Sequence, residues 1–309
     1  MIREFPLLFH QKRFDAAGNQ TYSPRVQASV IRVPATTSNL GPGFDALGVA
    51  LNLYNYVSIA PADDFSKDPF MTEISDAFFK TSRRKPQPFS VQIKGDVPRS
   101  SGLGSSVTVR LGLFFALNFL HGKPLAPEKF LELTIQLEGH PDNAAPAFYG
   151  GFTAGSMEKH FRARVSPKLF FVAAIPRFEL ATNSARAILP PQVSRKDAAH
   201  NIQHAALITA AFASRQYEVL RGAASDCLHQ PYRAKLIPGF EDALKAAEKA
   251  GALAAYLSGS GPTVMAMTLK NPQKIGVAMK NALEKASGSH VDVKVLKADN
   301  RGIYSVIKK

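Results

Sequence analysis

The sequence predicts an α+β protein of two domains. The chain has 309 residues, about twice the roughly 150 residues of a typical domain. Patterns typical of strands and of helices follow one another without strict alternation, which favours α+β over a parallel sheet with alternating helices. We expect an N-terminal extension over residues 1–26, an N-terminal domain over residues 27–162 and a C-terminal domain over residues 163–309.

The first half of the chain contains three strand patterns and one long apolar stretch. Residues 26–33 and 47–60 have enough apolar alternation for strands, and residues 89–94 (FSVQIK) repeat that pattern. Residues 61–88 are polar and contain several prolines, which predicts a connection. Residues 107–120 (VTVRLGLFFALNFL) are apolar and long enough for a buried helix.

The rest of the chain mixes helices and short strands. Alanine and leucine predict helices over residues 198–215 and 217–229, and a turn at Pro238-Gly239 starts another over residues 240–250. Residues 127–137 also fit a helix. The remaining predicted strands cover residues 148–154, 169–175, 252–257, 263–269, 291–295 and 303–307.

Composition excludes several classes of protein. Lysine and arginine outnumber aspartate and glutamate by 38 to 24, giving a net charge of +14. These basic residues are dispersed, without zinc-finger spacing or an aromatic RNA-binding signature, so we expect no nucleic-acid partner. The single cysteine, Cys227, excludes an intrachain disulfide and indicates a reducing, cytoplasmic compartment. No apolar run approaches the roughly 20 residues of a membrane span, so we expect no membrane partner.

A glycine–serine loop, PRSSGLGSS at residues 98–106, separates a predicted strand from the apolar helix. Gly102 and Gly104 allow backbone amides to approach a ligand closely, and the helix start adds unpaired N–H groups with about half a positive charge. Such a loop suits a phosphate. It is not a Walker A motif, because no Gly-Lys-Ser/Thr follows the glycines. A plain turn that caps a helix is the alternative interpretation.

Three further segments gather polar side chains around glycines. PATTSNLGPGFD at residues 34–45 joins two predicted strands. LEGHPDNAAPAFYGG at residues 137–151 places two acids, a histidine and an asparagine in a turn after a helix. LSGSGPT at residues 257–263 is a glycine turn between strands. Four polar segments in one chain indicate a composite binding site.

These motifs resemble those of the galactokinase–homoserine kinase–mevalonate kinase–phosphomevalonate kinase (GHMP) superfamily. SNLGPGFD, EGHPDNAAPAFYGG and DCLHQPYRAKLIPGF are similar to the homoserine kinase family within it. The resemblance spans about residues 27–309. It implies a two-domain GHMP-kinase fold with the active site in the inter-domain cleft. It also implies transfer of the γ-phosphoryl group of ATP to the hydroxyl of L-homoserine, giving O-phospho-L-homoserine and ADP in threonine biosynthesis.

The resemblance also assigns site residues. It implies that the ATP phosphates are bound by Pro98, Arg99, Ser100, Ser101, Gly102, Leu103, Gly104, Ser105 and Ser106. Mg²⁺ is expected on Ser106 and Glu138, since a hard cation prefers oxygen ligands. The substrate is expected on Asn39, Asp45, His140, Asp142, Thr182, Arg233 and Gly259, with Asn143 and Arg186 as catalytic residues. Each also has an ordinary alternative as a helix cap, surface ion pair or hydrogen-bonded turn.

The sequence does not identify the group that accepts the proton of the substrate hydroxyl. Several relatives use an aspartate where this chain has Asn143, and asparagine accepts no proton at neutral pH. Our hypothesis is that catalysis rests on positioning and charge stabilisation, because a loose phosphoryl-transfer transition state asks little of a base. The loop also departs from the family pattern, with Ser100-Ser101 before its glycines and Val107-Thr108-Val109 after its serines.

Two other functions stay open at this point. A GHMP-type kinase for another small alcohol, such as L-threonine or a mevalonate-like acid, would carry the same phosphate loop. A non-catalytic nucleotide-binding module would carry that loop without needing Arg186 and Arg233. The resemblance also implies a homodimer.

Overall fold

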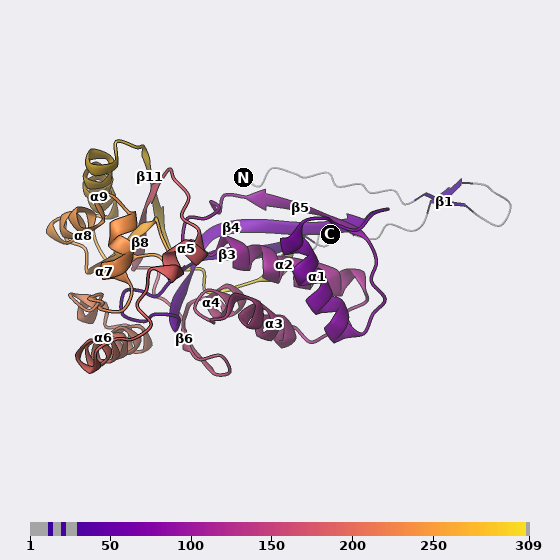
Figure 1. Cartoon of the computed structure of the whole chain (residues 1–309), viewed down its shortest axis with the longest axis horizontal. Coiled ribbons are helices and arrows are strands. Elements are labelled where there is room, and N and C mark those ends of the chain that lie inside the picture. The colour runs from indigo at the N-terminus through magenta and orange to yellow at the C-terminus, as the bar shows by residue number, and fades with distance from the viewer. Residues whose placement is uncertain (1–11, 15–19, 23–29, 307–309) are drawn as a thin grey trace.

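The computed structural model describes residues 12–14, 20–22 and 30–306, and these form two lobes of sheet and helix (Figure 1). Within the expected extension, β1 (Lys12–Phe14) pairs antiparallel with β2 (Gln20–Tyr22), and the rest lies outside the described residues. Helices in the described ranges all lack the combination of length and apolar character that a membrane span needs. The α+β class is confirmed.

The first lobe is built on a six-stranded sheet. Its order is β12-β3-β4-β6-β7, with β5 also paired to β4. Helices α1–α4 lie together on one face of this sheet (Figure 1). The strands are β3 (Val30–Ser38), β4 (Leu47–Pro61), β5 (Phe89–Gly95), β6 (Phe152–Gly155), β7 (His160–Ala163) and β12 (Tyr304–Val306). The helices are α1 (Pro69–Ser82), α2 (Ser105–Leu120), α3 (Glu128–Glu138) and α4 (Ala144–Tyr149).

Helix α2 is the centre of the first lobe. It packs against β3 and β4, where Gly112 brings its backbone against Val57. Ile31 and Val33 of β3 join Phe114 in one core cluster, and all three are fully buried. Because α2 is fixed along its length, its first turn is held at one end of the lobe.

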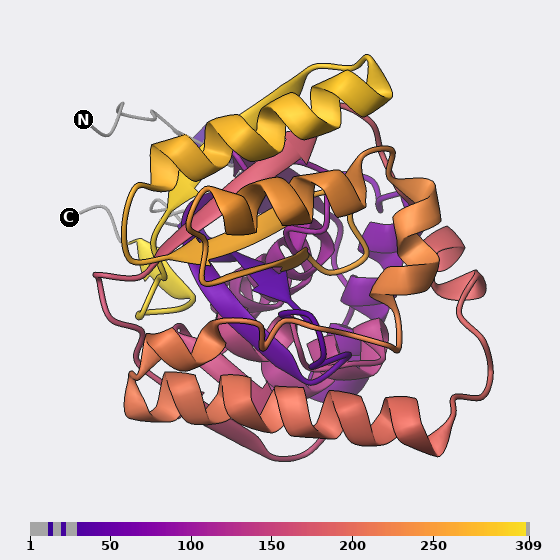
Figure 2. The same cartoon turned by 90° about the vertical axis from the view of Figure 1, so that its left-hand side faces the viewer.

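The second lobe has a four-stranded antiparallel sheet in the order β11-β8-β10-β9. Two helices, α8 and α9, run side by side next to it (Figure 2). The strands are β8 (Phe170–Pro176), β9 (Ala254–Leu257), β10 (Val264–Thr268) and β11 (Val291–Leu296). The helical segments are α5 (Thr182–Ala187), α6 (Arg195–Ser214), η1 (Tyr217–Leu220), α7 (Gln230–Arg233), η2 (Ala234–Leu236), α8 (Phe240–Lys249) and α9 (Pro272–Ser287).

A shared core joins the two lobes. Leu51 and Phe152 of the first sheet belong to the same buried cluster as Phe171 of the second and Phe212 of α6. The rings of Phe152 and Phe212 stack with centroids 4.3 Å apart. The last strand, β12, returns to the first sheet beside β3. The division of the chain at residues 162 and 163 stays a prediction.

Several sequence expectations needed correction. The connection at residues 61–88 contains α1, which Asp68 caps by accepting a hydrogen bond from the Phe70 backbone. The helix expected over residues 217–229 is wrong: η1 is only four residues long, and Gly222 adopts a positive φ of 75° that ends it. Residues 148 and 149 complete α4, so the strand starts only at Phe152.

The remaining differences concern missed elements and strand ends. Helices α5, α7 and α9 and strands β1, β2 and β7 were not predicted. Strand β3 continues to Ser38 instead of ending at residue 33, while residues 26–29 of that prediction lie outside the described ones. The extension of β3 matters because it carries Thr36 and Ser38 to the site.

Candidate active site

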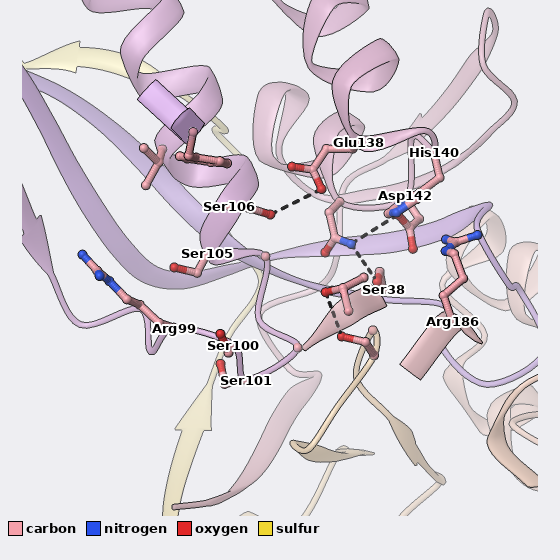
Figure 3. A pocket seen from close by; sticks show the side chains of 18 of the residues that line it. Ser38, Arg99, Ser100, Ser101, Ser105, Ser106, Glu138, His140, Asp142 and Arg186 are labelled. Carbon is pink, nitrogen blue, oxygen red and sulfur yellow. Dashed lines mark hydrogen bonds and ion pairs between the residues drawn. The ribbon is translucent and has the colours of Figure 1, made fainter. Parts of the chain in front are cut away.

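A cavity of about 450 Å³ is lined by both lobes. Figure 3 shows Arg99 and the loop serines on one side of it, and His140, Asp142 and Arg186 on the other. The predicted site residues that line it are Asn39, Asp45, Arg99, Ser100, Ser101, Gly102, Gly104, Ser105, Ser106, Glu138, His140, Asp142, Asn143, Thr182, Arg186, Arg233 and Gly259. Two predicted residues do not: Leu103 is fully buried in the core, and Pro98 lies outside the lining.

The glycines of the loop are required by close backbone approach. Gly102 and Gly104 have φ values of 79° and 68°, which side-chain-bearing residues rarely adopt. A Cβ at Gly102 would lie 2.1 Å from the Ser258 carbonyl oxygen, and one at Gly104 would lie 2.0 Å from Thr36 Oγ1. Gly104 precedes α2 without a side-chain cap, so the first turn of α2 presents backbone N–H groups beside the cavity.

Asn143 is fixed beneath this loop. Its Oδ1 accepts a hydrogen bond from Thr36 Oγ1 at 2.6 Å. Its Nδ2 donates to Ser38 Oγ at 2.9 Å and to Asp142 Oδ1 at 3.2 Å. These contacts engage both ends of the amide. The geometry gives Asn143 a positioning role and provides no proton acceptor there.

His140 and Asp142 form a close pair on the wall facing Arg186. Nδ1 of His140 lies 2.5 Å from Oδ1 of Asp142, whose side chain is 2% exposed. Burial lowers the pKa of His140, but the hydrogen bond to Asp142 and the charges of nearby carboxylates outweigh burial and raise that pKa above its ordinary value. The pair therefore favours an imidazolium beside a carboxylate.

Two arginines face the same region. Arg186 donates to both carboxylate oxygens of Asp45, at 3.0 and 2.9 Å, and the hydrogen bonds to Asp45 raise the pKa of Arg186. Arg233 is 2% exposed and donates to the carbonyl oxygens of Ala185 and Gly259. Burial, helped by the charge of Arg186, lowers the pKa of Arg233 to about 10. Both guanidinium groups stay cationic at neutral pH.

The loop carrying Asp45 is tied to the glycine turn of the second lobe. Asn39 accepts a hydrogen bond from the Asp45 backbone and donates to the Gly259 carbonyl at 3.0 Å. Both residues have positive φ, 67° for Asn39 and 57° for Asp45, a strained conformation that clusters at functional sites. Thr182 reaches the same turn through Ser260, with 3.3 Å between their hydroxyl oxygens.

Ser106 and Glu138 fit a divalent cation. Ser106 Oγ donates to Glu138 Oε2 at 3.3 Å, so a hydroxyl and a carboxylate oxygen meet at the cavity wall (Figure 3). This is the oxygen donor set that Mg²⁺ prefers when phosphates complete its shell. Asp45, His140 and Asp142 also come within 4.8 Å of one another. That second group fits a metal less well, because Arg186 neutralises Asp45 and His140 favours its protonated form.

Some lining residues were not predicted from the sequence. Five of them surround the end of the cavity near α1 and β5: Asp68, Phe70, Met71, Ile93 and Val109. Asp68 followed by Pro69 is a helix-start signal, an N-cap and a proline in the first turn, that the polar composition of residues 61–88 obscured. Ser38 also lines the cavity and belongs to the PATTSN segment already singled out.

Comparison with known proteins decides the family. The GHMP kinases N terminal domain model matches residues 70–151, and the GHMP kinases C terminal model matches residues 207–285. A homoserine kinase of Clostridium beijerinckii is 40% identical over 88% of this chain and 96% of its own length. The chain belongs to the homoserine kinase family. A homoserine kinase of Aquifex aeolicus is 39% identical over 88% of this chain and 98% of its own.

The fold of the homoserine kinase family agrees with this structure. The crystal structure of homoserine kinase from Cytophaga hutchinsonii superimposes with a TM-score of 0.82 and 27% identity, covering 93% of this chain and 100% of that one. The resemblance to GHMP kinases, the fold and the class of ATP-dependent small-molecule kinase are therefore confirmed.

Proposed function

We propose that the protein transfers the γ-phosphoryl group of ATP to the hydroxyl of L-homoserine, forming O-phospho-L-homoserine and ADP in threonine biosynthesis. The observation that carries the proposal is an arginine–carboxylate arrangement opposite a phosphate-binding loop in one cavity. The arginine–carboxylate arrangement suits an amino acid, and the phosphate-binding loop suits ATP. We include a cytoplasmic location in the proposal, in keeping with the single cysteine, Cys227.

The charged wall suits an amino-acid zwitterion. Arg186 and Arg233 bring two cations together, and their mutual repulsion favours an anion between them. The planar carboxylate of homoserine matches a guanidinium fork. Asp45 and Asp142 then receive the ammonium group. Asp45 occupies the fork of Arg186, so the zwitterion inserts into this ion pair by exchanging partners.

The opposite wall suits the nucleotide. The loop from Pro98 to Ser106 encloses the phosphates with backbone amides, hydroxyls and the start of α2. Ser106 and Glu138 would hold Mg²⁺. Bound there, that ion would neutralise charge on the β- and γ-phosphates. The apolar side chains of Phe70 and Met71 line the same cavity beyond the loop and suit the adenine ring.

Catalysis rests on positioning. Asn143 and Arg186 both line the cavity. Asn143 holds β3 in fixed relation to Asp142, and β3 is in turn tied to the loop by the Thr36 backbone, which donates to the Leu103 carbonyl. Arg186 orients the acceptor by its carboxylate. The hydroxyl proton leaves late or passes to the transferred phosphoryl group, because the transition state asks little of a base.

The test is ADP release with Mg-ATP and four acceptors: L-homoserine, L-threonine, L-serine and mevalonate. We expect the highest kcat/KM for L-homoserine. A higher value for L-threonine would overturn the substrate while keeping the kinase. ATP binding in calorimetry with no turnover of any alcohol would instead favour a nucleotide-binding module.

The homodimer stays a proposal, and α6 is the surface we assign to it. No aspartate, glutamate, lysine or arginine stands between Asp197 and Arg215, and Ile202 and Leu207 are 69% and 45% exposed. An uncharged face is where two copies of a chain with net charge +14 approach at least electrostatic cost. Light scattering of the wild type and of Ile202→Lys tests it: a dimer that the substitution dissociates supports the proposal, and a wild-type monomer contradicts it.

A further inference from the structure

Arg110 is a buried charge in an apolar helix. It is the only charged residue among residues 107–120, and it is 8% exposed. A guanidinium withdrawn from water requires carboxylate partners, because an unpaired buried charge is strongly unfavourable. Its partners therefore explain why an arginine stands one turn beyond Ser106 on α2.

Arg110 contacts two other helices. Its Nε donates to Oε1 of Glu138, the last residue of α3, at 2.8 Å. Its Nη1 donates to Oε2 of Glu73 on α1 at 2.6 Å. The guanidinium carbon also lies 4.6 Å from the ring centre of Phe70. One side chain thus ties α1 and α3 to α2 beside the cavity.

The contact divides the two oxygens of Glu138. Oε1 belongs to Arg110, and Oε2 faces Ser106 Oγ at 3.3 Å. We propose that Arg110 is a positioning residue for the divalent cation: it fixes Glu138 so that a single carboxylate oxygen faces the phosphate loop. The proposal rests on the assignment of Ser106 and Glu138 as cation ligands under the proposed function.

Arg110 also links the expected cation site to α1, which lines the nucleotide side of the cavity. Phe70, which contacts Arg110, lines the cavity, and Glu73 lies one turn further along α1. Movement of α1 therefore displaces Arg110 and, through it, the Glu138 carboxylate. Hydrogen-bonding partners of a metal ligand typically contribute 10- to 100-fold to metal affinity. We expect Arg110 to have an effect of that order.

The test measures Mn²⁺ binding in the presence of ADP, by electron paramagnetic resonance and by calorimetry, with no acceptor alcohol. We expect Arg110→Met to weaken Mn²⁺ binding about tenfold or more, with partial recovery in Arg110→Lys. The KM for L-homoserine should stay near the wild-type value. Unchanged Mn²⁺ affinity in Arg110→Met would overturn the proposal.

The matched control is Arg32→Met. Arg32 has a side chain of similar exposure, 12% against 10% for Arg110. It pairs with Asp299 and stacks on Tyr54 and Tyr304, away from the cavity lining. It should lower the melting temperature and leave Mn²⁺ affinity unchanged. Equal loss of Mn²⁺ affinity in both variants would reduce Arg110 to a purely structural role and overturn the proposal.

A second variant covers a failure of Arg110→Met to fold. Glu73 has a side chain 47% exposed, so Glu73→Gln should fold while loosening Arg110. We expect weaker Mn²⁺ binding with a smaller loss than in Arg110→Met, because Glu73 contacts Arg110 and not Glu138. No change would contradict the proposal. Because the Mn²⁺ binding measurements use no acceptor, failure of the wild type to phosphorylate L-homoserine would refute only the proposed function.

Discussion

The two walls of the cavity bind charge by different means. The phosphate wall uses backbone amides, glycines and hydroxyls from one continuous segment, with Arg99 the single cation on residues 98–106. The amino-acid wall uses full charges on Asp45, Asp142, Arg186 and Arg233, which come from segments far apart in the sequence. Oriented backbone dipoles thus bind the phosphoryl group, whose charge is diffuse and which is transferred. Ion pairs bind the compact amino-acid zwitterion, which stays in place.

The largest expected effect is on the amino-acid wall. Arg186→Met removes two charged hydrogen bonds, worth about 2 kcal/mol each, so kcat/KM for L-homoserine should fall about 1,000-fold. The KM for ATP should not change. Steady-state kinetics with each substrate varied in turn checks this. Arg177→Met is the matched control, since Arg177 forms an exposed pair with Asp292 outside the cavity lining. A parallel rise in the KM for ATP in Arg186→Met would contradict the assignment of separate substrates to the two walls.

The next effect is on the phosphate wall. Gly104→Ala places a methyl group 2.0 Å from Thr36 Oγ1 and disturbs the start of α2, so kcat/KM for ATP should fall about 100-fold. Gly122→Ala is the control, because Gly122 has a similar φ of 77° but nothing within 4 Å of the added Cβ. That control should lose only stability, measured by thermal unfolding. If both variants lost ATP turnover equally, backbone strain and not loop geometry would be responsible.

The phosphate wall could be predicted from the sequence better than the amino-acid wall, because it comes from one continuous segment. PRSSGLGSS is contiguous, and its glycines, serines and adjoining helix indicate phosphate binding without the fold. The amino-acid wall could be predicted only from the family resemblance, because the motifs alone do not place Asp45 opposite Arg186, 141 residues later. Arg110 was missed for the same reason, since Glu138 and Glu73 are 28 and 37 residues away.

The prediction of local structure failed where side chains compete with the backbone for hydrogen bonds. The helix expected over residues 217–229 is replaced by a turn in which the Asp226 carboxylate accepts hydrogen bonds from three backbone amides, those of Leu228, His229 and Gln230. Short polar side chains favour such turns over helix interiors. Conversely, α1 forms among polar residues because Ile74, Phe78 and Phe79 bury one face of it.

A smaller effect concerns the residue between the walls. Asn143→Ala should lower kcat about tenfold, because Thr36 of β3 and Asp142 lose the hydrogen-bond partner that they share. Asn143→Asp separates positioning from base catalysis. We expect kcat to fall in it too, since a carboxylate repels the transferred phosphoryl group. Rapid-quench measurement of the chemical step checks both, and a faster step in Asn143→Asp would show that a base was lacking.

The smallest effect is the pH dependence of stability at His140. Its folded-state pKa is raised, mainly by Asp142 against the opposing effect of burial, so the imidazolium–carboxylate pair stabilises the fold. That contribution is fully present below about pH 6.5, the ordinary histidine value, and is lost as pH rises through the raised pKa. Urea unfolding of wild type and His140→Asn should show a difference that shrinks in that direction. A difference that grows with pH would contradict the assignment.

The division of labour between the walls is tested most directly with truncated acceptors. 4-Hydroxybutyrate lacks the ammonium group of L-homoserine, and 3-aminopropan-1-ol lacks the carboxylate, while both keep the hydroxyl. We expect kcat/KM for each to fall at least about 100-fold below that of L-homoserine, with the KM for ATP unchanged. Turnover of either analogue at the L-homoserine rate would show that the charged wall does not select the acceptor.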